Sequence, residues 1–102
     1  MRILIDDERN WCCDGKAPDL IVRNYDTARF LLDSGIILSS DVDLTIDHDL
    51  GEGPSGYDFI TLCESLISYG PYPRPRSIEC ISANPPGRKR IEQAIHNIYK
   101  ER

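Results

Sequence analysis

The order of hydrophobic and polar residues along the chain predicts strands that alternate with helices. Short runs rich in isoleucine, leucine and valine, bounded by polar, glycine or proline residues, predict four strands. These strands lie at residues 2–5, 20–25, 42–46 and 77–81. Apolar residues spaced three and four apart predict three helices. The first helix is capped by Asp26 and stops at Gly35, and the second covers residues 57–68. The third follows a break at 85–87, and its apolar face consists of Ile91, Ala94, Ile95, Ile98 and Tyr99.

This alternation predicts a single α/β domain over residues 1–102, because strands joined through helices build a parallel sheet with right-handed crossovers. We expect a truncated parallel sheet of about four strands in the order 2-1-3-4, covered by about three helices. The segment 10–19 contains Gly15 and Pro18 but no helical spacing, which predicts a long loop where a helix is lost or shortened. Trp11 is the expected anchor of this loop.

Polar side chains follow three of the predicted strands at the point where each strand ends. The residues are Asp6 and Asp7, then Asp47, His48 and Asp49, and finally Ser82 and Asn84. In an open parallel sheet the carboxyl ends of the strands meet at one edge, where ligands bind. Carboxylates gathered there repel one another, and hard oxygen ligands are what Mg²⁺ and Mn²⁺ require. We therefore expect one divalent cation, Mg²⁺ or Mn²⁺, at this edge. Its predicted ligands are Asp6, Asp7, Asp47 and Asp49. The alternative is that some of these acids cap turns or face solvent.

The start of the last predicted helix is a candidate phosphate site. Free backbone N–H groups and the helix dipole favour an anion there, and a basic run at 88–90 supplies local positive charge. The predicted phosphate ligands are Ser82, Asn84, Gly87, Arg88 and Lys89. The alternative reading of the basic run is an ordinary solvated helix start.

Net charge narrows the possible partners. The chain carries a formal charge of −5 at pH 7, whereas binding along double-stranded DNA needs a clustered basic surface. The first apolar run has only three residues before the acids begin, which is too short for a signal peptide or a membrane span. We therefore expect a cytoplasmic protein without a double-stranded DNA or membrane partner.

Four segments carry a resemblance to a known family: DDER at 6–9, IDHDLG at 46–51, GYD at 56–58 and ISANPPG at 81–87. They resemble the motifs DDER, LDHDLG, GYD and HSxNPxG of the cyclic-phosphate processing domains, a small family similar to response-regulator receiver domains. The resemblance spans nearly the whole chain and implies a small receiver-like (flavodoxin-like) three-layer fold. Ile81 stands where the family pattern has a histidine.

The resemblance implies a cyclic phosphate as substrate, on a nucleotide or on the end of an RNA. A cation held by the aspartates can polarise a phosphodiester oxygen and lower the pKa of water that opens the ring. The candidate catalytic residues are Asp47, His48 and Ser82, and His48 is suited to protonating the leaving alkoxide because its unperturbed pKa lies near neutrality. Histidine beside carboxylates is also often a structural ion pair. Two hypotheses stay open: a metal-dependent cyclic phosphodiesterase, and a non-catalytic module that binds a phosphate ligand or a protein.

Overall fold

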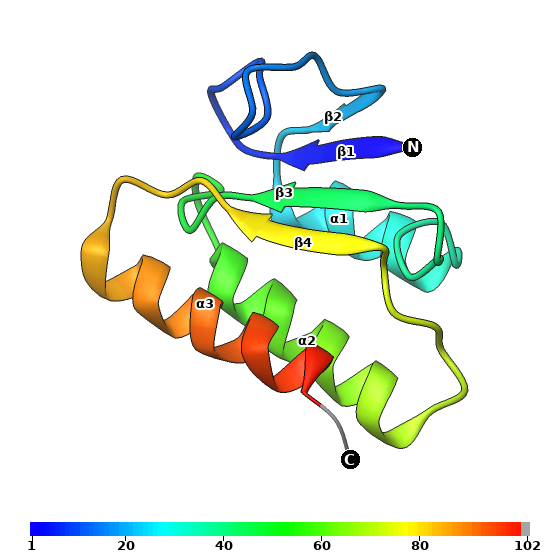
Figure 1. Ribbon diagram of the computed structural model, residues 1–102. Coiled ribbons are helices and arrows are strands. Elements are labelled where there is room, and N and C mark those ends of the chain that lie inside the picture. The colour runs from blue at the N-terminus through cyan, green and yellow to red at the C-terminus, as the bar shows by residue number, and fades with distance from the viewer. Residues whose placement is uncertain (101–102) are drawn as a thin grey trace.

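The computed structural model describes residues 1–100, which form a four-stranded parallel sheet and three helices (Figure 1). The strands are β1 (Arg2–Ile5), β2 (Leu20–Val22), β3 (Asp43–Ile46) and β4 (Ser77–Cys80). The helices are α1 (Tyr25–Asp33), α2 (Gly56–Tyr69) and α3 (Pro85–Tyr99). The strand order is β2-β1-β3-β4 and every neighbouring pair is parallel. The predicted α/β class and strand order are confirmed.

One face of the sheet carries the hydrophobic core. Ile3 and Ile5 of β1 and Leu44 and Ile46 of β3 are at most 1% exposed and belong to this core. The helices contribute Ala28 and Leu32 of α1, Phe59, Ile60 and Cys63 of α2, and Ile91, Ala94 and Ile98 of α3. Because side chains alternate between the two faces of a strand, the residues directly after Ile5 and Ile46 project toward the opposite face.

The opposite face is covered by the loop between β1 and β2, which runs above the sheet in Figure 1. This loop takes the place of a third, helical layer, as the predicted loss of a helix at 10–19 implies. Arg2 donates to Asp14 of the loop at 2.8 Å. Trp11 is 58% exposed, so its expected anchoring role is wrong. The neighbouring Cys12 is buried instead, because the tight turn formed by the Gly15 N–H donating to the Cys12 carbonyl holds it against the sheet.

Helices α1 and α3 begin two and three residues earlier than the sequence predicts, and α2 begins one residue earlier. Asn24, not Asp26, caps α1, because its side-chain oxygen accepts the Thr27 N–H at 2.8 Å. The predicted break at 85–87 is the first turn of α3, since proline is favoured at first helical positions, whose N–H groups have no partner within the helix. No helix within residues 1–100 is long and apolar enough to span a bilayer.

An ion pair ties the start of β3 to the residue that precedes β4. Arg76 donates through Nε to Asp43 at 3.0 Å and through Nη2 to the second carboxylate oxygen, and the Ser77 hydroxyl donates to the same group. These contacts, the Arg76 bonds foremost, hold the pKa of Asp43 well below its usual range. Such a carboxylate stabilises the fold above its ordinary pKa of about 4 and loses that contribution as the pH falls through the folded value.

Arg76→Ala should lower the free energy of unfolding only slightly at pH 7, because the pair lies near the surface. The difference from wild type should shrink below about pH 4, where protons begin to compete for the carboxylate. Urea unfolding followed by circular dichroism at pH 7 and pH 3 measures both differences. Equal differences at the two pH values would contradict the assignment.

Candidate metal and phosphate site

The register of the sheet brings Asp6 and Asp47 side by side. Ile5 of β1 pairs with Ile46 of β3, so these acids are the next residues on two adjacent strands. The hydrogen-bond ladder continues through them: the Asp47 N–H donates to the Ile5 carbonyl and the Asp6 N–H to the Val22 carbonyl, both at 2.9 Å. Packing of the core, which fixes the register, therefore also fixes the spacing of the two carboxylates.

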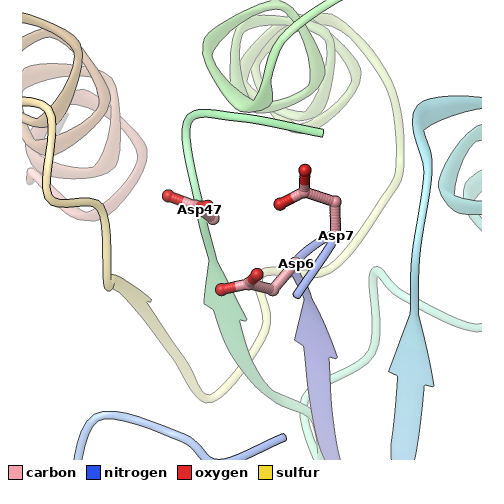
Figure 2. A group of neighbouring side chains, drawn as sticks. All are labelled: Asp6, Asp7 and Asp47. Atoms are coloured by element: carbon pink, nitrogen blue, oxygen red, sulfur yellow. The ribbon is translucent and has the colours of Figure 1, made fainter. Parts of the chain in front are cut away.

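Asp7 joins this pair to form a group of three acids. One carboxylate oxygen from each of Asp6, Asp7 and Asp47 lies within 4.8 Å of the other two (Figure 2). Asp6 is 0% and Asp47 is 6% exposed, whereas Asp7 is more open. Burial and the Asp6 charge raise the pKa of Asp47, and the His48 N–H, Arg9 and the Ser82 hydroxyl only partly oppose the rise. Closely spaced hard oxygen donors of this kind fit a divalent cation.

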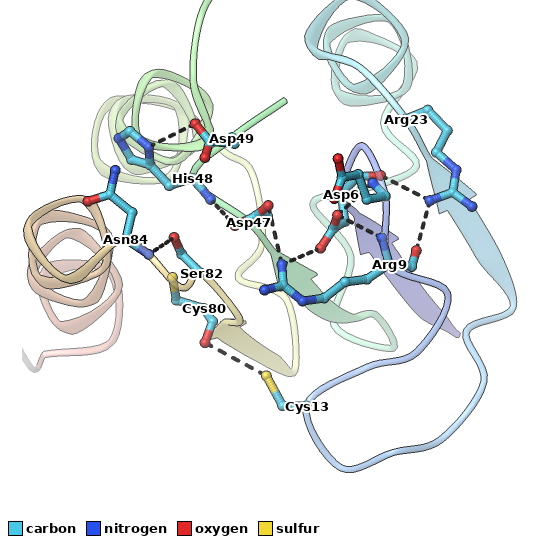
Figure 3. Close-up of polar contacts among 11 residues, drawn as sticks. Asp6, Arg9, Cys13, Arg23, Asp47, His48, Asp49, Cys80, Ser82 and Asn84 are labelled. Carbon is cyan, nitrogen blue, oxygen red and sulfur yellow. Dashed lines mark hydrogen bonds and ion pairs between the residues drawn. The ribbon is translucent and has the colours of Figure 1, made fainter. Parts of the chain in front are cut away.

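Arg9 is the central residue of the site that sequence reasoning missed. Its Nη1 atom lies 3.1 Å from Asp6 Oδ2 and 3.4 Å from Asp47 Oδ2, bridging the two buried acids (Figure 3). The other oxygen of Asp6 accepts the backbone N–H groups of Glu8 and Arg9 at 2.8 and 2.9 Å. The arginine of the DDER segment was the available signal, but only the fold of the loop shows that it turns back onto the acids.

An open pocket of about 440 Å³ lies beside the three acids. It is lined by Asp7, Glu8, Arg9, Asp47, Asp49, Ala83 and Asn84. The predicted residues Asp49 and Asn84 are therefore at the site, although the Asp49 side chain is 74% exposed and lies outside the close three-acid group. Ser82 is buried beneath the pocket, where its hydroxyl accepts the Asn84 N–H at 3.0 Å.

His48 packs against α3 and does not line the pocket. In Figure 3 its ring extends away from Asp6 and Arg9. A Cβ atom on Gly87 would lie 2.4 Å from the imidazole Cδ2, so the ring rests directly on the glycine backbone. The imidazole Nδ1 is buried without a hydrogen bond to any of residues 1–100, and it lies 3.7 Å from Asp49 Oδ1. His48 therefore has a clear packing contact but no contact that prepares it for proton transfer.

In the part of the chain that the structure describes, each residue in the first turn of α3 either is a proline or has its backbone N–H already bonded. Pro85 and Pro86 have none, the Gly87 N–H donates to the Asn84 side chain at 3.1 Å, and the Arg88 N–H donates to the Asn84 carbonyl at 2.8 Å. Gly87 packs beneath the His48 ring, and its role as a phosphate ligand stays a prediction.

The basic run after this turn lies outside the pocket. The Arg88 side chain lines a separate cavity of about 410 Å³ between β4 and α3, and it pairs with Glu92 at 3.6 Å. The Arg90 guanidinium lies 5.1 Å from the centre of the Tyr57 ring. Lys89 is exposed and is not among the residues that line the acidic pocket. The structure therefore does not bring the predicted ligands Arg88 and Lys89 to the site.

The loop after Asp49 returns tightly onto the end of β3. The Gly56 N–H donates to the His48 carbonyl at 2.8 Å, and a Cβ atom on Gly56 would lie 1.9 Å from the Asp47 carbonyl oxygen. Only glycine fits there. Ser55 and Asp58 form a capping box that starts α2 at this contact, so the start of α2 packs directly on the backbone of Asp47.

A parallel sheet of order β2-β1-β3-β4 with acids beyond β1 and β3 defines a receiver-like domain. The family model described as "Cyclic-phosphate processing Receiver domain" matches residues 1–97, and the chain belongs to this family. Searches of curated proteins and of solved structures gave no significant match. Family membership ties the chain to cyclic-phosphate processing.

Asp47→Asn should stabilise the metal-free protein at pH 7. Because the pKa of Asp47 is raised, its ionised form is less favourable in the folded protein than in the unfolded chain, and this cost is present above the folded pKa. Well below the ordinary aspartate pKa of about 4, both states bind the proton and the gain should disappear. Urea unfolding of the variant and of wild type in EDTA, at pH 7 and at pH 3, measures this difference in the free energy of unfolding.

The same variant should lose stabilisation by divalent cations. Mg²⁺ at a hundredfold excess over its Kd should stabilise wild type by about 2.7 kcal/mol, whereas Asp47→Asn should gain little. Asp43→Asn, at the opposite end of β3, is the matched control and should keep the wild-type response. A wild-type melting temperature that stays constant across millimolar Mg²⁺ and Mn²⁺ would rule out the cation site.

Gly87→Ala should destabilise wild type by about 1–3 kcal/mol, because the added methyl group overlaps the His48 ring. In a His48→Ala background the ring is absent, and the same change should be neutral or stabilising, since alanine is the better helix former. A double-mutant cycle of urea unfolding energies measures this coupling. If Gly87→Ala costs the same in both backgrounds, the ring does not rest on Gly87.

Proposed function

We propose that this domain opens a cyclic phosphate, on a nucleotide or on the end of an RNA, with the help of one Mg²⁺ or Mn²⁺ ion. The observation that carries the proposal is the group of Asp6, Asp7 and Asp47, whose carboxylate oxygens lie within 4.8 Å of one another and of which Asp7 and Asp47 line an open pocket. Membership of the cyclic-phosphate processing family supports the substrate class.

The proposed cation ligands are the carboxylates of Asp6, Asp7 and Asp47, with Asp49 as a further acid at the rim of the pocket. When bound, the cation would supply positive charge that polarises a phosphoryl oxygen and lowers the pKa of water. The raised pKa of Asp47 supports this assignment, because a cation would relieve the repulsion between Asp47 and Asp6 that contributes to the shift.

The protein groups around the pocket would orient the substrate. The Asn84 N–H donates to the Ser82 hydroxyl, and the Asn84 side-chain oxygen accepts the Gly87 N–H. Both the backbone and the side chain of Asn84 are therefore held in the lining of the pocket. The pocket is a local hollow lined mainly by carboxylates, which repel the backbone of double-stranded DNA.

A second candidate function is capture of the phosphate ligand without turnover. Two observations favour it. His48 rests on Gly87 outside the pocket lining, and Ile81 replaces the other histidine of the family pattern. Within residues 1–100, the side chains that line the pocket and titrate are all carboxylates, apart from Arg9, which stays protonated. Protonation of the leaving alkoxide would then need a rotated His48, a carboxylic acid or water.

The experiment is an assay of cyclic mononucleotides, cyclic dinucleotides and cyclic-phosphate-ended RNA, with Mg²⁺, with Mn²⁺ and with EDTA. We expect ring opening of at least one substrate that depends on the cation, measured by ³¹P NMR, and its loss in Asp47→Ala. Saturable, cation-dependent binding without product would establish the capture function instead. Neither binding nor product from any substrate would contradict both.

His48→Ala separates the two roles of His48 once a substrate is known. Loss of a general acid should lower kcat on the order of a hundredfold while leaving cation and ligand affinity nearly intact. Loss of a packing contact should lower the free energy of unfolding and leave kcat near that of wild type. Arg88→Ala, outside the pocket, is the control.

A further inference from the structure

Arg9 is the only basic side chain that lines the acidic pocket within the described residues 1–100. The same pocket is lined by four carboxylates, from Asp7, Glu8, Asp47 and Asp49. A phosphate anion that enters the pocket meets net negative charge, which disfavours binding unless positive groups face the anion. A divalent cation would offset part of that charge, but the protein itself offers one guanidinium.

The other groups expected to bind an anion are committed elsewhere. Arg88 lines a different cavity, and the Arg90 guanidinium lies over the Tyr57 ring. The amides in the first turn of α3 are absent at the prolines or bonded to Asn84. Elimination therefore leaves Arg9 as the group with the charge, the planar donor geometry and the position to contact a phosphate.

The guanidinium of Arg9 is held by the oxygens that a cation would use. One atom, Nη1, contacts both Asp6 Oδ2 and Asp47 Oδ2. The main chain of Arg9 is fixed independently, because its N–H donates to Asp6 Oδ1 and its carbonyl accepts from Arg23 at 2.8 Å. The side chain is 38% exposed at the pocket, so it has room to turn while the loop stays in place.

We propose that Arg9 is the phosphate-binding residue of this site and that it exchanges partners when the cation binds. Asp6 and Asp47 hold the guanidinium in the metal-free protein, where it balances two buried charges. Once these carboxylates bind the cation, Arg9 is released toward the pocket and contacts the phosphate. The inference rests on the proposed function, because it takes the cation and a phosphate ligand from it.

The exchange requires opposite effects of one substitution on two ligands. In Arg9→Ala the carboxylates have no competing partner, so Mg²⁺ should bind more tightly than to wild type, by about tenfold. Binding of inorganic phosphate to the Mg²⁺-loaded protein should weaken about tenfold or more, because a charge-assisted hydrogen bond is lost. Isothermal titration with Mg²⁺ alone, and then with phosphate, measures both. Arg9→Lys keeps the charge without the fork and should recover only part of the phosphate affinity.

Arg88→Ala is the matched control and should leave both affinities at wild-type values, because Arg88 lies outside the pocket. The melting temperature of Arg9→Ala should fall below wild type in EDTA and return to the wild-type value in saturating Mg²⁺. If Arg9→Ala binds phosphate as tightly as wild type, or binds Mg²⁺ more weakly, the proposed role of Arg9 is wrong, whereas the proposed function of the domain is unaffected. Absence of Mg²⁺ binding by wild type would overturn the proposed function together with this inference.

Discussion

Repulsion between the Asp6 and Asp47 carboxylates is the constraint on which the rest of the site depends. The core sets the pairing of Ile5 with Ile46, and this pairing leaves the two acids adjacent and almost unexposed. A slip of β1 against β3 by one residue would separate them, but it would also turn the core isoleucines toward the wrong face. Relief must therefore come from groups that other parts of the chain bring to the acids.

The loop after β1 supplies the groups that relieve this repulsion. Asp6 accepts two backbone N–H groups from the residues that follow it, which bends the chain sharply at once. Arg9 is thereby brought back over both carboxylates, and Arg23 at the end of β2 holds the turn through the Arg9 carbonyl and the Asn10 side chain. The loop that stands in place of a helix therefore also brings these donors to the two acids.

Residues governed by short-range rules were predictable from the sequence. Alternating apolar residues located the strands, and the meeting of strand ends at one sheet edge located Asp6, Asp7 and Asp47 together. The basic run was predicted at the start of the last helix, but α3 begins three residues earlier at Pro85, and the Arg88 N–H is already bonded to the Asn84 carbonyl. The position of the Arg9 guanidinium over the acids and the contact of the His48 ring with Gly87 both depend on how the folded segments pack together. No local pattern encodes those contacts.

Asp47 and His48 are neighbours in the chain, yet their side chains lie in different parts of the molecule. The carboxylate of Asp47 belongs to the acidic site, whereas the imidazole of His48 is wedged against the first turn of α3 with no space for a methyl group between them. A single peptide unit therefore separates the ligand site from the helical layer. A displacement of Asp47 would act directly on the His48 ring and on the helix backbone that it contacts. The amide resonances of Gly87 and Arg88 are therefore the natural place to detect, from outside the pocket, that the acids have bound a ligand.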